Sequence, residues 1–157
     1  MIRLIIICVY LKSKYQDLKG GKDMLYNVTW KNSKTKQIYN ATKRSEELMS
    51  YLEDSLLNSE LVQLIGEKPV PDKGREYGEM IYYYKSKPKR RLLSAAPRRD
   101  NDYIHVVIFR GILTKEQIIQ NGFEIGSYPD PTPDIKLHSR AEIDVLIELL
   151  KKMVQQI

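Results

Sequence analysis

Two short runs of mainly apolar residues lie near the start of the chain, at Leu25–Trp30 and Gln37–Thr42. Both are rich in β-branched and aromatic residues, and the polar segment KNSKTK separates them, so we predict a β-hairpin. Apolar residues then recur at helical spacing in a segment that begins at Ser45, a residue suited to cap a helix. The predicted face comprises Leu48, Tyr51, Leu52, Ser55 and Leu56. We expect the helix to continue through Ile65 and to end at Gly66.

The middle of the chain has the pattern of a three-stranded antiparallel meander. We expect a loop over Glu67–Gly78, which contains prolines and glycines. Runs of β-branched, aromatic and aliphatic residues then predict strands at Glu79–Lys85, Arg90–Ala96 and Tyr103–Gly111. The third run is almost continuously apolar, which favours a central position in the sheet.

The C-terminal part contains two capping boxes, at Thr114–Gln117 and Ser139–Glu142, and each predicts the start of a helix. A short strand is expected between them at Ile135–Leu137. The last helix has an apolar stripe of Ile143, Leu146, Ile147, Leu150 and Val154. The fold class is therefore α+β: a mainly antiparallel sheet, made of the N-terminal hairpin and the meander, with a central helix, a short helix and a C-terminal helix packed on it.

Residues 1–23 differ in character from the rest of the chain. The apolar run Leu4–Leu11 is too short to span a bilayer, and the charged segment after it has the composition of a linker. The codons for Lys19–Gly21 can spell a bacterial ribosome-binding sequence, so we predict that translation starts at Met24 and that residues 24–157 form a single domain. A short anchor or an extra edge strand remains the alternative. Cys8 is the only cysteine, which excludes an intramolecular disulfide and fits a reducing, cytoplasmic environment.

Basic residues are concentrated in one segment of the chain. The formal net charge is +6, and residues 85–99 contain seven basic residues and no acidic one. If the meander forms, its two turns lie at opposite ends of the sheet, so Arg98 and Arg99 are separated from the first five charges. Those five are Lys85, Lys87, Lys89, Arg90 and Arg91. They can follow a phosphate backbone, and Tyr82 and Tyr84 are candidates to stack on bases.

Other chemistry has weaker support in the sequence. His138, Asp134 and Glu142 lie near one another and are candidate metal ligands, although their spacing matches no recognised site. His105 lies in the main predicted strand and is interpreted as a packed core histidine. Asp134–Lys136 matches one half of a metal-dependent nuclease motif, but no partner motif has a suitable spacing. Neither a phosphate-binding glycine loop nor a nucleophile elbow occurs, so we expect a binding protein without a cofactor, rather than an enzyme.

The segments Ile104–Gly111 and Ile135–Met153 resemble the YdhG-like families, which are small bacterial α+β domains. The positions that match are Ile135, Lys136, Leu137, Ser139, Glu142, Ile143 and Asp144. The N-terminal hairpin has no counterpart in these families, and the proline-rich segment before Ile135 departs from their pattern. One branch of them is similar to a frataxin-like iron chaperone, and a similar domain occurs beside defence genes. The resemblance therefore implies a metal-carrying role or a defence-associated role as alternatives.

The sequence thus predicts a small binding protein. The leading hypothesis is that it binds nucleic acid or another phosphate-rich ligand through the basic hairpin at Lys85–Arg91. The alternatives are a frataxin-like metal chaperone, or a protein-interaction or inhibitor module from a mobile element or defence system that uses exposed tyrosines and the segment SYPDPTP. The oligomeric state is not indicated by the sequence.

Overall fold

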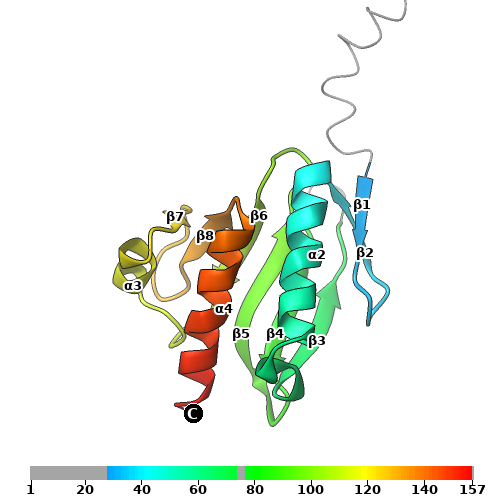
Figure 1. The fold of residues 1–157 in the computed structure, drawn as a ribbon. Helices are drawn as coiled ribbons and strands as arrows, with labels where there is room; N and C mark the ends of the chain where they lie inside the picture. The colour runs from blue at the N-terminus through cyan, green and yellow to red at the C-terminus, as the bar shows by residue number, and fades with distance from the viewer. Residues whose placement is uncertain (1–27, 74–76, 157) are drawn as a thin grey trace, which may run out of the picture.

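The computed structural model describes residues 28–73 and 77–156 (Figure 1). The predicted N-terminal extension at residues 1–23 and the predicted start at Met24 lie outside the described residues. The described part has an α+β fold, as the sequence predicts. An N-terminal hairpin and a six-stranded antiparallel sheet form its β-structure, and helices pack on the sheet.

The N-terminal hairpin forms a small sheet of its own. Strands β1 (Val28–Lys31) and β2 (Ile38–Ala41) pair antiparallel. Trp30 and Tyr39 are buried, with ring centroids 5.8 Å apart. The Tyr39 hydroxyl donates to the carbonyls of Val70 and Glu79, 3.0 Å from each, and so fixes the hairpin to the main sheet.

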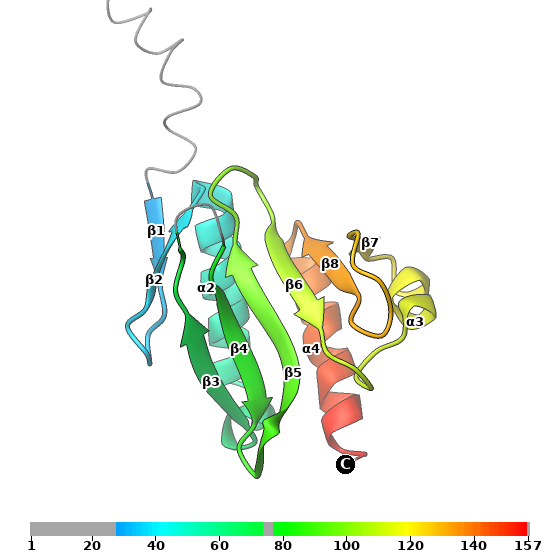
Figure 2. The same ribbon diagram turned by 180° about the vertical axis from the view of Figure 1, so that it is seen from behind.

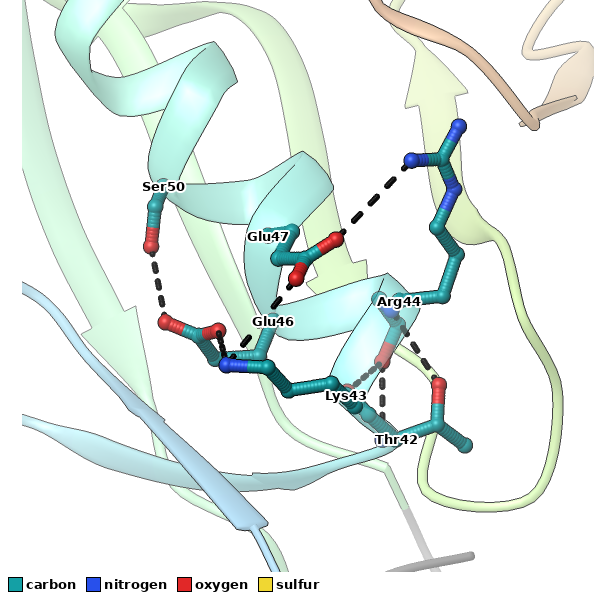
Figure 3. Close-up of polar contacts among 7 residues, drawn as sticks. Thr42, Lys43, Arg44, Glu46, Glu47 and Ser50 are labelled. Carbon is teal, nitrogen blue, oxygen red and sulfur yellow. Dashed lines mark hydrogen bonds and ion pairs between the residues drawn. The ribbon is translucent and has the colours of Figure 1, made fainter.

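Helix α2 (Lys43–Leu57) follows the hairpin directly. Its N-cap is Thr42, three residues before the predicted cap, and Ser45 completes a reciprocal capping box as the third helical residue. The Thr42 amide and the Ser45 hydroxyl both donate to the carbonyl of Arg98, and the Thr42 hydroxyl donates to the carbonyl of Asn101. The start of the helix therefore holds the turn at residues 98–101. Figure 3 shows the side chains around it: Thr42, Lys43, Arg44, Glu46, Glu47 and Ser50.

The main sheet has the strand order β3-β4-β5-β6-β8-β7, and every neighbouring pair is antiparallel. Its strands are β3 (Ile65–Val70), β4 (Glu79–Tyr84), β5 (Lys87–Pro97), β6 (Ile104–Ile108), β7 (Glu124–Ile125) and β8 (Asp134–Leu137). The predicted meander is confirmed as β4-β5-β6, and β6 is central, between β5 and β8. The two turns of the meander lie at opposite ends of the sheet, as predicted.

The predicted continuation of the first helix is wrong, because the chain turns into the sheet. Helix α2 ends at Leu57, a 3₁₀ turn η1 spans Glu60–Gln63, and Ile65–Val70 forms the edge strand β3 instead of helix and loop. An edge strand tolerates proline, because it has a side that carries no ladder hydrogen bonds. The ring of Tyr83 on β4 covers Gly66, where a Cβ atom would lie 2.6 Å from the ring.

Helices α2 and α4 (Arg140–Val154) cover one face of the sheet side by side, and the short helix α3 (Lys115–Gln120) lies beyond the β7 edge (Figures 1 and 2). The two long helices and the sheet enclose one continuous core. The Tyr51 hydroxyl of α2 donates to Asp144 of α4 over 2.6 Å. In the described part of the chain, no helix has the length and apolar character needed to span a bilayer.

Candidate functional site

The face of the sheet opposite α2 and α4 is not covered by any described helix (Figure 2). A hollow of about 700 Å³ lies on this open face, over strands β4, β5 and β6. Its wall combines two arginines, a histidine and four aromatic rings. Its lining includes Tyr77, Glu79, Arg91, Ser94, Ala96, Arg98, Asp100, Tyr103, His105, Phe109 and Tyr128. We refer to it as the open-face hollow.

A β-bulge in β5 brings Arg91 to this face. Tyr82 pairs with Leu93, whereas the next residue, Tyr83, pairs with Arg91, so the register shifts by one residue at Leu92. Leu92 and Leu93 are both buried in the core. Without the bulge, strict alternation would place Arg91 on the opposite face from Ser94. Its guanidinium lies 5.5 Å from the ring centroid of Phe109.

Arg98 lies at the other end of the open-face hollow, just after the end of β5. Its guanidinium is 4.1 Å from the ring centroid of Tyr77, and the Tyr77 hydroxyl donates to Asp100 over 2.6 Å. Burial, followed by this hydrogen bond, raises the pKa of Tyr77. The Arg98 carbonyl is held by the start of α2, as described above. Arg91 and Arg98 therefore mark the two ends of one hollow, roughly 20 Å apart along the strand at about 3.3 Å per residue.

A histidine–aspartate pair lies between these arginines. His105 faces Ala96 on β5, and its Nε2 lies 2.6 Å from Oδ2 of Asp134 on β8. Asp134 pairs with Val107 in the sheet, so its carboxylate reaches diagonally across the strands to His105. The second carboxylate oxygen accepts the amide of Tyr128 over 2.8 Å.

Burial explains the protonation of this pair. Desolvation lowers the pKa of His105, and it outweighs the hydrogen bond to Asp134, which acts in the opposite direction. For Asp134, burial alone would raise the pKa, but the hydrogen bonds from His105 and from the Tyr128 amide outweigh it and leave the pKa below its usual value. At neutral pH Asp134 is therefore ionised, and a neutral His105 donates Nε2–H to it.

The two carboxylates in the wall of the hollow are already bound to protein donors. Glu79 accepts the hydroxyl of Ser94 over 2.5 Å, and Asp100 accepts the Tyr77 hydroxyl and the Asn101 amide. These bonds occupy carboxylate oxygens, while the guanidinium groups of Arg91 and Arg98 lie over the rings of Phe109 and Tyr77 in the wall of the hollow.

The predicted basic residues do not form one patch. Lys85 Nζ donates to the Val62 carbonyl over 2.8 Å, and the Arg90 guanidinium lies 5.6 Å from the ring centroid of Tyr84. Lys87 and Lys89 are exposed near the tip of the β4–β5 hairpin. Arg91 alone among the five lines the open-face hollow. It also lines a second hollow of about 580 Å³ together with Lys89 and Tyr83, which connects the hairpin to the open face.

Tyr82 and Tyr84, the two predicted base-stacking residues, are both buried. Their exposed fractions are 1% and 5%, because they point to the face that α2 and α4 cover. Their rings are therefore not available to a ligand. The rings on the open face are instead half-buried Tyr77, Tyr103 and Phe109, and exposed Tyr128.

The three candidate metal ligands have separate partners. Asp134 binds His105, and Nε2 of His138 lies 2.5 Å from Glu124. Glu142 accepts the backbone amides of His138 and Ser139 as part of the capping box of α4. Within residues 28–73 and 77–156, no three His, Cys, Asp or Glu side chains are grouped so that they could hold a metal ion.

The sequence reasoning missed the role of His105 in this site. Alternation along β6 places Ile104, Val106 and Ile108 in the core, and therefore His105 and Val107 on the other face. That signal was present in the sequence. The pairing with Asp134 was not, because it depends on β8 lying beside β6.

No protein-family model, curated protein or solved structure matches this chain. The resemblance to the YdhG-like families, and the iron-chaperone and defence roles that it implies, stay predictions.

Proposed function

We propose that the protein binds single-stranded nucleic acid along the open face of its sheet, and that the exposed lysines of the β4–β5 hairpin extend the same binding surface. The observation that carries this proposal is the alignment of Arg91 and Arg98 at the two ends of one hollow that also contains aromatic rings. Guanidinium groups bind phosphates, and aromatic side chains stack on bases of any sequence.

The shape of the surface favours a single strand over a duplex. In a duplex the faces of the bases are stacked on one another, so rings on a sheet surface cannot reach them. In a single strand the bases can turn onto exposed Tyr128 or half-buried Tyr103, while the backbone passes Arg91 and Arg98, whose guanidinium groups lie over Phe109 and Tyr77. The second hollow, which Arg91 shares with Lys89, offers a route for the strand to continue past the hairpin tip.

The test is a titration of fluorescein-labelled single- and double-stranded DNA and RNA, followed by fluorescence anisotropy over a series of salt concentrations. We expect the single strands to bind more tightly than the duplexes, with an affinity that decreases steeply as salt increases. The double variant R91A/R98A should weaken binding at least tenfold. It should also reduce the magnitude of the salt slope by about 1.4, since each lost phosphate contact on a single strand contributes about 0.7.

A matched control separates the site from net charge. Lys43 on α2 and Lys152 on α4 are exposed on the helix-covered side of the molecule. The variant K43A/K152A removes two positive charges, the same number as R91A/R98A. We expect this variant to bind as the original protein does. Equal losses in the two double variants, or no binding at low salt, would contradict the proposed site.

A further inference from the structure

The site contains a histidine that has the surroundings of a general base. His105 lies in the wall of the open-face hollow, and its side chain is 11% exposed. One ring nitrogen, Nε2, is bound to Asp134. The other, Nδ1, has no hydrogen-bond partner among the described residues, so the hollow presents a lone pair to a ligand. Small residues on β5, Ser94 and Ala96, leave room beside the ring.

Asp134 is held in a fixed position, as a residue that orients a general base must be. It is 3% exposed, and it is held by His105 and by the Tyr128 amide. Its carboxylate also packs against Gly126, where a Cβ atom would lie 1.9 Å from Oδ2. A carboxylate that fixes the tautomer of a histidine and stabilises the imidazolium is the usual companion of a general base.

The charged groups around His105 come from three elements. Arg98 lies after β5, Glu79 is on β4 and Asp134 is on β8, and all three act electrostatically on the histidine. Arg98 and His105 line the same hollow, so a phosphate bound to Arg98 would share that hollow with the imidazole. The guanidinium could then stabilise charge that develops on the phosphate oxygens during a reaction.

Among the described residues that line the hollow, none offers a suitable nucleophile. Ser94 has the only aliphatic hydroxyl in the wall of the hollow, but it is 1% exposed and donates to Glu79. A base at this position would therefore act on a hydroxyl of the ligand. In a single-stranded nucleic acid, the hydroxyl next to each phosphate is the 2′-hydroxyl of RNA, and DNA lacks it.

We propose that the protein cleaves single-stranded RNA in the open-face hollow, with His105 as the general base and Asp134 as its positioning residue. This inference rests on the proposed binding function. His105 Nδ1 takes the proton of the 2′-hydroxyl, and the 2′-oxygen forms a bond to the adjacent phosphorus. The bond from phosphorus to the 5′-oxygen breaks, and that oxygen takes a proton from solvent water. The imidazolium then returns its proton to the hydroxide left behind. The products are a 2′,3′-cyclic phosphate and a 5′-hydroxyl, with no change in oxidation state.

The test uses the full chain and a short fluorescein-labelled RNA. The products are separated on a denaturing gel, and their masses are measured by mass spectrometry. We expect shortened products that end in a cyclic phosphate, in the presence of a chelator. A matched RNA with 2′-O-methyl groups should remain intact. The variant H105A should cleave at least a hundredfold more slowly, a loss within the usual range for a general base. The affinity of H105A for the uncleavable RNA is measured separately, so that a loss of rate is distinguished from a loss of binding, and added imidazole should restore part of the rate.

The outcomes distinguish this inference from the proposed binding function. Anisotropy with the uncleavable RNA reports binding alone, and circular dichroism reports whether H105A is folded. Binding without cleavage, or cleavage by H105A at the original rate, would overturn the assignment of His105 and leave the binding function intact. Absence of binding would overturn both. Cleavage of the 2′-O-methyl RNA would also exclude the mechanism, since no nucleophile would then be present on the ribose.

Discussion

At the scale of single residues, the protonation of His105 links the site to stability. Its pKa is lowered in the folded protein, so between the folded and unfolded pKa values the unfolded chain binds more protons. The contribution of neutral His105 to the free energy of unfolding should therefore be fully present above the ordinary histidine pKa of 6.5, and it should decrease as the pH falls below that value. The measurement is urea unfolding from about pH 7.5 down to about pH 5.5, a range above the titration of most carboxyl groups. In H105Q this part of the pH dependence should disappear, and an unchanged pH profile would contradict the assignment.

Asp134 allows a second test of the same pair. The variant D134N removes the charge that favours the imidazolium, so the pKa of His105 should decrease further. The measurement is an NMR titration of the His105 ring, with His138 as the internal control, because His138 lies outside the hollow and contacts Glu124. An unchanged titration would contradict the hydrogen bond between Asp134 and His105.

The buried Tyr82 supplies a further prediction. The Tyr82 hydroxyl is buried and has no hydrogen-bond partner among the described residues, and burial raises the pKa of Tyr82 well above its usual value. Removal of an unsatisfied buried polar group relieves a desolvation penalty, so Y82F should raise the free energy of unfolding by about 1 kcal/mol. The control Y51F deletes an exposed hydroxyl that donates to Asp144 and should give no gain. Nucleic-acid affinity should be unchanged in Y82F, because the ring faces the core.

At the scale of elements, the segment between β7 and β8 determines whether the site forms. Gly126 lies so close to Asp134 that a side chain would displace the carboxylate. We expect G126A to reduce stability by about 1–3 kcal/mol, the usual cost of overpacking, and to weaken the His105–Asp134 hydrogen bond. The neighbouring S127A, at an exposed position, is the control. Thermal unfolding measures the first effect, and the chemical shifts of the His105 ring measure the second.

The elements also show what the sequence could and could not predict. The capping boxes at Thr114 and Ser139, the apolar stripe of α4 and the meander follow local rules, and each was found. Strand β3 was missed because Gly66 and Pro69 indicate a loop, whereas pairing with β4 overrides that local preference. The bulge at Leu92 was missed for a similar reason: two adjacent buried leucines are compatible with a regular strand until the register of both neighbours is known.

At the scale of the whole molecule, the hairpin β1–β2 belongs to the cooperative unit. Trp30 is the only tryptophan, it is 1% exposed, and it lies in the same core as α2 and the sheet. We therefore expect its fluorescence and the far-ultraviolet circular dichroism to change at the same temperature during thermal unfolding. A fluorescence transition that precedes the loss of secondary structure would mean that the hairpin unfolds separately.

The attachment of the start of α2 to the Arg98 carbonyl has a consequence for the behaviour of the molecule when a ligand binds. The peptide that carries Arg98 is fixed by donors from Thr42 and Ser45, on the opposite side of the sheet from the hollow. A ligand that immobilises the Arg98 side chain should also restrict the opening of the first helical turn. Ligand binding in the hollow would then be detectable on the other side of the sheet, as slower exchange of the backbone amide hydrogens of residues 42–46 with deuterium.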